Sequence, residues 1–384
     1  MALTNTVRIA IASVTALVFV GGGLAYYAWQ SSEKTGEVTS TNSAAALPAT
    51  IYVSIVTHNE DTEGAHAYDF ASNESAYAAQ RDQIVKFAAM LAEHEVKYDF
   101  QTDWNFLLGM KAFDHGDTLT NGKNLLQYLV EDLGMVVDPH SHEHNGYNYA
   151  DVAYLISTFG VTPSGIVGGF IASPASESIW DEFTKPMQGE KYPDYTWNLT
   201  ATWGGGTYGH VGDAAMDTSG IWLPTSAKDF FTNDPTGSLP NIGRYNGDWS
   251  GLDDLLEKQK NGELEAGHMY TATVYTSQYI LTDQYIAAFS SMLDEYKADT
   301  DAGKLVWVTL PEALKIWETS YHETPTILGL SDGITESALS MSNSKAADMV
   351  GVPLPAAGKG SLECGDGVCT IPENSFNCAD DCRE

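Results

Sequence analysis

Short apolar segments rich in β-branched residues alternate with segments whose apolar residues recur at helical spacing between residues 51 and 322. The predicted strands are residues 51–57, 96–101, 135–138, 165–172, 196–203, 269–276 and 305–310. The predicted helices are residues 75–95, 122–133, 149–159, 251–261, 282–299 and 311–319. Because strands that alternate with helices are typical of parallel β–α units, we expect an α/β fold. About seven such units favour a (β/α) barrel over an open sheet.

The amino terminus carries the one long apolar run of the chain, residues 9–29, between Arg8 and the next charged residue, Glu33. Its length suffices for a bilayer-spanning helix, which needs ~20 residues, whereas the core of a cleaved signal peptide has about 7–15. The basic residue precedes the run, so we expect the rest of the chain to face outwards. We therefore predict that residues 1–30 anchor an extracytoplasmic protein in the membrane, or that the protein is secreted if this helix is cleaved as a signal.

Two polar segments separate the predicted globular domain, residues 51–322, from the two ends. Residues 31–50 and 323–361 are rich in small and polar residues and are typical of flexible linkers. Residues 362–384 contain all the cysteines, which are Cys364, Cys369, Cys378 and Cys382. Their spacing fits a zinc site poorly, and their clustering favours a small disulfide module formed in an oxidising compartment. Acidic side chains among them are candidate calcium ligands, and a bare disulfide knot with solvated acids is the simpler interpretation.

Composition and charge narrow the classes of partner. The chain has 384 residues, of which 43% are hydrophobic, and this excludes a disordered chain. A single long apolar run excludes a polytopic membrane protein. The 51 acidic residues outnumber the 19 basic ones and give a net charge of -32, which argues against a nucleic-acid partner. The same charge disfavours an anionic polymer as substrate unless salt screens it, and favours a neutral or cationic one.

Histidines concentrate directly after the predicted strand 135–138. His140, His142 and His144 fall within five positions, next to Asp138. On a helical turn, His140 and His144 would share one face because they are four residues apart. Two such imidazoles and one carboxylate from another strand make an open three-ligand site, which suits zinc or another divalent ion that keeps a water. The sequence therefore predicts a metal site at the carboxyl ends of the strands.

The H-S-x-x-H pattern from His140 to His144 resembles the second motif of NodB-type polysaccharide deacetylases, which are carbohydrate esterases. The adjacent acids Glu60 and Asp61, after the predicted strand 51–57, resemble the first motif of that family, with Glu in place of the usual Asp. The resemblance implies a distorted (β/α) barrel and hydrolysis of N- or O-acetyl groups on sugars. It also implies that Glu60 is the general base and that Asp61, His140 and His144 are metal ligands.

Other motifs of the family are altered or absent in this chain. No arginine occurs in residues 168–174, where the family's third motif would place one, and the late Leu-x-His motif is replaced by a segment that ends in Thr276 and Ser277. The weak candidates for the missing general acid are His268 and His210. Asp194 and Trp197 resemble the family's Asp-and-Trp motif, which implies a role at the substrate site. The carboxyl-terminal segment resembles CGDG-type Cys-rich modules of exported microbial proteins.

Three other interpretations of these residues remain open. In the first, the barrel is an inactive surface protein that binds glycans or mediates adhesion. Alternatively, His140 and His142 lie on one face of an extended segment and form the His-x-His pattern of amidohydrolases and PHP phosphoesterases. The third is structural: His140 and His144 are surface residues, and Glu60 and Asp61 cap a helix. We interpret His58 as a residue of the barrel mouth, with a metal ligand as the alternative.

Overall fold

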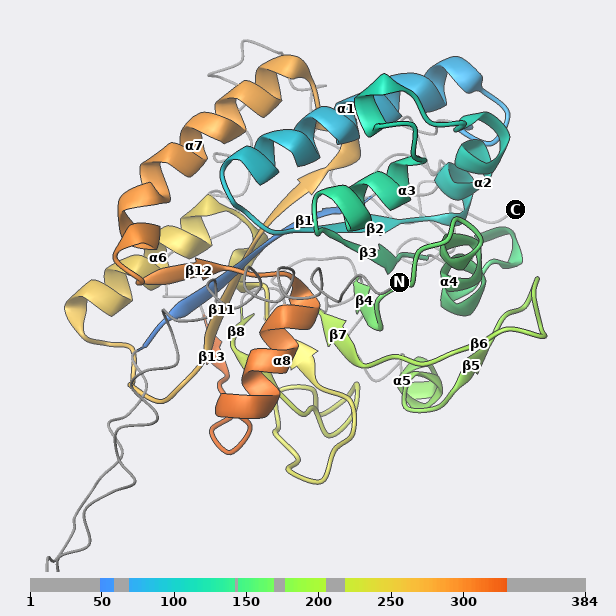
Figure 1. Cartoon of the computed structure of the whole chain (residues 1–384). Helices are drawn as coiled ribbons and strands as arrows, with labels where there is room; N and C mark the ends of the chain where they lie inside the picture. The colour runs from blue at the N-terminus through green and yellow to red at the C-terminus, as the bar shows by residue number, and fades with distance from the viewer. Residues whose placement is uncertain (1–48, 59–68, 142–143, 169–176, 205–217, 330–384) are drawn as a thin grey trace, which may run out of the picture. The chain divides into compact units, whose positions relative to one another are not determined.

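The computed structural model describes residues 49–58, 69–141, 144–168, 177–204 and 218–329 (Figure 1). These residues all belong to one compact unit, residues 47–384. In this part of the chain no helix is both long and apolar enough to cross a membrane. The predicted span 9–29, the predicted linker 31–50 apart from its last two residues, and the Cys-rich segment lie outside the described residues, so these expectations stay predictions.

Five parallel strands form the first sheet. Their order is β11-β1-β2-β3, and β12 also pairs with β1. The strands are β1 (Ile51–His58), β2 (Tyr98–Thr102), β3 (Val136–Pro139), β11 (Tyr270–Ser277) and β12 (Leu305–Trp307). Along β1, the whole strand pairs with β11, and residues 55–58 pair with β2. Because the strands are parallel, their carboxyl ends meet at one edge, which confirms the expected parallel α/β arrangement.

A second sheet continues this arrangement. Its order is β4-β7-β10-β9, with β4, β7 and β10 parallel and β9 antiparallel. The strands are β4 (Ile166–Gly168), β7 (Ala201–Trp203), β10 (Asn241–Ile242) and β9 (Ile221–Trp222). Backbone hydrogen bonds join the two sheets on both sides: Ser164 donates to Val137 at 2.9 Å, and Thr273 donates to Arg244 at 2.9 Å. The parallel strands β1, β2, β3, β4, β7, β10 and β11 therefore follow one another in a series of contacts that returns to β1.

Helices cover the outer face of the first sheet (Figure 1). The longer ones are α1 (Glu74–Glu93), α2 (Trp104–Phe113), α4 (Tyr149–Ser157), α6 (Trp249–Asn261) and α7 (Asp283–Asp301). Helix α8 (Leu310–Ser320) packs on the opposite face, where Leu314 and Trp317 share an apolar cluster with Val56 of β1. Side by side, α1 and α7 pack through Phe87 and Phe289, whose ring centroids are 5.0 Å apart. Polar residues fix where helices begin: Asn73, Asp103 and Thr309 accept backbone hydrogen bonds at the starts of α1, α2 and α8.

Shorter elements complete the described part. They are α3 (Leu125–Gln127), α5 (Glu177–Phe183), a π-helical turn (Tyr128–Asp132), the pair β5 (Met187–Gln188) and β6 (Thr196–Trp197), and the pair β8 (Thr218–Ser219) and β13 (Leu328–Gly329). Four 3-10 turns occupy Thr118–Thr120, His144–Gly146, Tyr245–Gly247 and Gln278–Ile280.

The structure corrects several predicted boundaries. The predicted strand 305–310 ends at Trp307, because Thr309 and Glu312 form a capping box that starts α8. The predicted strand 196–203 is divided into β6 and β7, which belong to different sheets. The predicted helix 122–133 consists only of α3 and the π-helical turn. Helix α2 was not predicted, although the side chain of Asp103 marks its start.

Candidate functional site

Two buried histidines meet at the carboxyl ends of the parallel strands. His58 ends β1, and His140 directly follows β3. Their ring centroids are 4.2 Å apart and their planes are inclined by 30°. The residues are only 7% and 1% exposed. The backbone N–H of His140 donates to the carbonyl of Thr102 at 2.9 Å. This hydrogen bond extends the pairing of β3 with β2 and fixes the backbone that carries the imidazole.

Two aromatic side chains, Trp203 and Tyr275, pack against His58, and we call them the aromatic wall. The rings of Trp203, at the end of β7, and Tyr275, in β11, lie nearly perpendicular to the ring of His58 at centroid distances of 5.6 and 4.9 Å. The indole N–H of Trp203 donates to the hydroxyl of Thr273 at 3.0 Å, and this hydrogen bond holds the indole against β11. The wall thus joins three strand ends that are far apart in sequence.

One arginine lies against the same wall. The guanidinium carbon of Arg244, which follows β10, is 6.0 Å from the ring centroid of Trp203 and 5.8 Å from that of Tyr275. A cation over an aromatic face is attracted by the negative charge density of the ring. His58 and Arg244 therefore contact the same two rings, and the site combines imidazole, guanidinium and aromatic groups.

Two buried carboxyls, Asp99 of β2 and Asp138 of β3, come before the carboxyl ends of their strands. Asp138 accepts hydrogen bonds from the amide of Gln101, at 3.2 Å, and from the hydroxyl of Ser164. Asp99 accepts from the backbone N–H of Leu310, the first residue of α8, at 3.0 and 3.1 Å. Burial raises the pKa of Asp138 to about 7. Burial and, next, the charge of Asp138 raise the pKa of Asp99 well above its ordinary value.

The segment after His140 is fixed by its own contacts. The hydroxyl of Ser141 donates to the carbonyl of Tyr147 at 2.6 Å. The ring of Tyr147 stacks on Trp104 with centroids 5.0 Å apart and planes inclined by only 4°. The ammonium of Lys191 lies 5.4 Å from the same tyrosine ring. The Ser141 hydrogen bond joins the start of the histidine loop, residues 140–147, to Tyr147 at its end.

The start of the loop is not helical. His140 and Ser141 are not part of a helix, the short 3-10 turn starts at His144, and α4 begins at Tyr149, after its capping residue Asn148. Asn145 and Gly146, which follow His144, have positive φ values of 55° and 70°. Residues 142–143 lie outside the described residues, so the prediction that His140 and His144 share one helical face stays a prediction.

The other predicted site residues are scattered. His268 precedes β11 and lies at the opposite end of that strand from Ser277, the partner of His58; its imidazole is 3.4 Å from the hydroxyl of Thr326. Asp194 is exposed. Trp197 lies in β6 and packs in a separate apolar cluster. Glu60, Asp61, His142, His210 and the four cysteines lie outside the described residues, and of His144 only the backbone is described.

Sequence reasoning missed Trp203, Tyr275, Arg244 and the carboxyl of Asp99. The rule that polar groups at the carboxyl ends of parallel strands form the site would have pointed to Arg244, had the short strand β10 been predicted. Within the described ranges, no three His, Cys, Asp or Glu side chains converge as a metal site would require. The predicted ligand Asp61 is not among them, so this finding leaves the predicted set untested.

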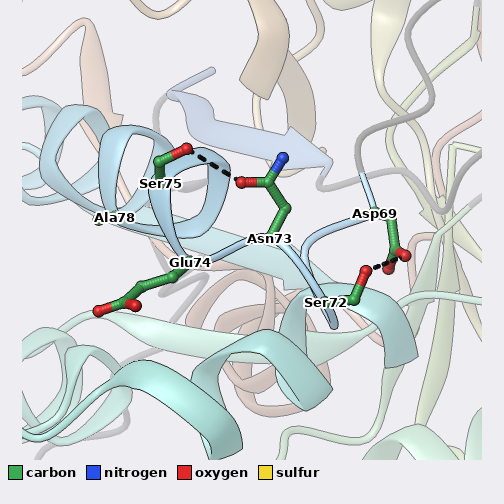
Figure 2. A pocket seen from close by; sticks show the side chains of 6 residues that line it. All are labelled: Asp69, Ser72, Asn73, Glu74, Ser75 and Ala78. Carbon is green, nitrogen blue, oxygen red and sulfur yellow. Dashed lines mark hydrogen bonds between the residues drawn. The ribbon is translucent and has the colours of Figure 1, made fainter.

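A separate hollow opens at the start of α1 (Figure 2). Its lining residues are Asp69, Ser72, Asn73, Glu74, Ser75 and Ala78. The oxygen of the Asn73 side chain accepts hydrogen bonds from the hydroxyl of Ser75 at 3.0 Å and from the backbone of Ala76 at 3.1 Å. These polar groups serve to cap the helix, and none of the strand-end residues described above lines the hollow.

Comparisons with known proteins identify no family for this chain and find solved structures of low similarity. No protein-family model matches the chain, and a search of curated proteins found no relative. Among solved structures, 4-alpha-glucanotransferase from Thermococcus litoralis is 11% identical, with a TM-score of 0.42; the match covers 74% of this chain and 42% of that one. A GH57 branching enzyme from Thermococcus kodakaraensis is 10% identical, with a TM-score of 0.39 and coverages of 70% and 71%. The chain thus spans less than half the length of the first.

Proposed function

We propose that the protein is an extracytoplasmic, metal-dependent hydrolase that resembles polysaccharide deacetylases and removes acetyl groups from a glycan. The observation that supports this proposal is the buried pair His58 and His140, whose rings are 4.2 Å apart at the carboxyl ends of β1 and β3. In a (β/α) barrel, which we propose for the ring of parallel strands, this end carries the catalytic groups. Residues 1–30 would hold the enzyme at the membrane.

The donors at this point suit a divalent metal, for which zinc is the best candidate. Neutral imidazole is a good zinc ligand at ~2.0–2.1 Å. The close approach of the two rings is compatible with both of them reaching one ion. His140, with Asp61 and His144, is the proposed ligand set, and the structure adds His58 as a neighbour. When bound, such a metal polarises a carbonyl group and makes water a stronger nucleophile.

Side chains of the protein carry out the proton transfer and the binding of the substrate in this proposal. Glu60 takes a proton from the attacking water while the new C–O bond forms at the acetyl carbon. The bond from that carbon to the sugar nitrogen or oxygen then breaks, and the sugar leaves with a proton while acetate is released. Trp203 and Tyr275 exclude water from His58, and the half-buried Tyr275 offers aromatic surface to the substrate. The net charge of -32 favours a neutral or cationic glycan.

Acetate release from acetylated glycans tests the proposal, measured together with the metal content of the purified full chain. We expect one tightly bound divalent ion and metal-dependent release of acetate. His140→Ala should lose both, whereas His115→Ala, which changes an exposed histidine in the turn after α2, should lose neither. A His140→Ala variant that keeps the metal and its activity would contradict the proposal.

A glycan-binding protein without catalytic activity is the second candidate. The position of His268 favours it, because this candidate general acid lies at the amino end of β11, away from His58 and His140. In that case the barrel binds metal and glycan and releases no acetate. The same assay therefore separates the two candidates.

A further inference from the structure

Arg244 occupies a slot that the fold builds around its side chain. Its guanidinium lies over Trp203 and Tyr275 and donates to the backbone carbonyl of Asn246 at 3.5 Å. Two glycines with positive φ also lie close to it: a Cβ on Gly247 would lie 2.8 Å from Nε of Arg244, and a Cβ on Gly204 would lie 3.3 Å from its Cδ. Any larger residue at these positions would press on the arginine, so backbone and aromatic rings both limit where the guanidinium can lie.

The backbone of Arg244 is equally well fixed. Its carbonyl accepts the hydrogen bond from Thr273 that joins β10 to β11, at 2.9 Å. Arg244 follows the carboxyl end of β10, and both Arg244 and His58 contact Trp203 and Tyr275. A long side chain held at its base, along its stem and at its head loses little entropy when it binds a ligand.

The second described arginine, Arg81 of α1, lies in another part of the fold. Arg81 is surrounded by acids: it makes ion pairs with Asp114 at 3.3 Å and with Asp117 at 2.9 Å, and it donates to Thr120 at 3.0 Å. The sequence has two further arginines, Arg8 and Arg383, near its ends. Arg244 is thus the one described arginine that the fold places at the histidine pair, against aromatic surface.

We infer that Arg244 is a catalytic residue that binds the acyl oxygen of the substrate and, after the reaction, the carboxylate of acetate. This inference rests on the proposed function. When water attacks the acetyl carbon, the electron pair of the C=O bond moves onto oxygen, and the N–H groups of Arg244 donate to that oxygen. The pair then re-forms C=O as the bond to the sugar breaks. A planar guanidinium suits a carboxylate because two parallel N–H groups can donate to its two oxygens.

Binding of acetate to the full-length protein tests the assignment without requiring turnover. Saturation transfer from protein to the acetate methyl group, observed by NMR, gives the affinity. We expect Arg244→Gln to weaken acetate binding about tenfold or more, because a charged hydrogen-bond donor is lost. Arg244→Lys, which keeps the charge without the fork, should weaken it less. Lys123→Gln, which removes one charge at an exposed ion pair with Asp132, is the matched control and should bind like the original protein.

Chemical rescue keeps the inference testable if a variant is impaired in other ways. Arg244→Ala should lose acetate release mainly through kcat, and millimolar guanidinium ion should restore part of it. Equal acetate affinity in Arg244→Gln and the original protein, or unchanged kcat in Arg244→Ala, would overturn the inference while leaving the proposed function intact. Arg244-dependent acetate binding in a protein that hydrolyses no acetylated glycan would remove the proposed function and retain an acetate site at Arg244.

Discussion

Ile51 begins β1 among aliphatic side chains, whereas His58 ends the same strand among imidazole, indole, phenol and guanidinium groups. Ile51 is fully buried and belongs to a cluster that includes Val53, Leu252 and Leu305. His58 is 7% exposed and contacts His140, Trp203 and Tyr275. Both ends are buried, but burial stabilises the first and is costly at the second, since polar groups lose their hydration. The polar groups buried at the carboxyl end lower the stability of the fold and supply side chains that can take part in chemistry.

Two buried carboxyls, Asp99 and Asp138, add to the polar groups of the first sheet. Both are fully buried within β2 and β3, and Asp138 is two residues before His140. Their hydrogen bonds with Leu310, Gln101 and Ser164 offset part of the desolvation cost. The first sheet therefore has an apolar face, where Phe100 and Val137 pack against helices, and an opposite face that carries the two buried carboxyls.

The largest expected loss of stability lies at the apolar end. Leu252 of α6 is fully buried against β1. Leu252→Ala should lower the free energy of unfolding by about 2–5 kcal/mol, because it removes apolar contacts and leaves a cavity. Denaturant unfolding measures this loss. The kcat of the protein that remains folded should not change; a lower kcat would show that the two ends are coupled.

The pH dependence of stability probes the buried carboxyls. Asp138 has a folded pKa of about 7, above its ordinary 3.8, so the folded state binds the proton more tightly than the unfolded state does. Stability from this group is full below pH ~4 and is lost as the pH rises towards 7. The loss amounts to a few kcal/mol, because each tenfold difference in proton affinity between the two states corresponds to about 1.4 kcal/mol.

Asp138→Asn removes this titration and keeps the shape of the side chain. We expect its unfolding free energy to fall less than that of the original protein between pH 4 and pH 8. Chemical denaturation at several pH values provides the comparison. Parallel curves for the two proteins would mean that Asp138 titrates in the folded state much as it does in the unfolded chain.

The histidine loop should show a smaller effect on stability and a larger one on the site. Ser141→Ala removes the hydrogen bond to Tyr147 and should cost about 1 kcal/mol of stability. If the loop positions metal ligands, metal affinity should fall about tenfold, as is typical for residues that orient ligands. Competition with a chelator measures this affinity. Thr309→Ala, which removes the cap of α8, should cost a similar amount of stability and leave metal affinity unchanged.

Much of the fold follows from the sequence because long periodic segments determine it. β1 and β11 form almost where their β-branched runs predict, and α1, α6 and α7 form where apolar residues recur at helical spacing. The short strands β7 and β10 have only three and two residues, too few for a periodic signal. Their pairing depends on contacts between distant segments, which local patterns do not encode.

The same limit explains what was found and missed at the site. His140 was predicted because three histidines follow a clear strand. Arg244 stands alone in its segment, and its place beside His58 depends on β10 pairing with β7 and on the hydrogen bond with Thr273. Residues 142–143 lie outside the described residues, so the helical turn expected for the histidine loop stays a prediction. Spacing along the chain pointed to His140 but could not place Arg244 beside His58.

An anomalous-scattering map of crystals of the zinc-loaded protein tests the central claim most directly. The account predicts a zinc peak within ~2.0–2.1 Å of an imidazole nitrogen of His140, at the carboxyl ends of β1 and β3, with the carboxylate of Asp61 in the same coordination sphere. The peak should be absent from crystals of His140→Ala. A fully occupied zinc peak elsewhere, with none at His140, would contradict the account.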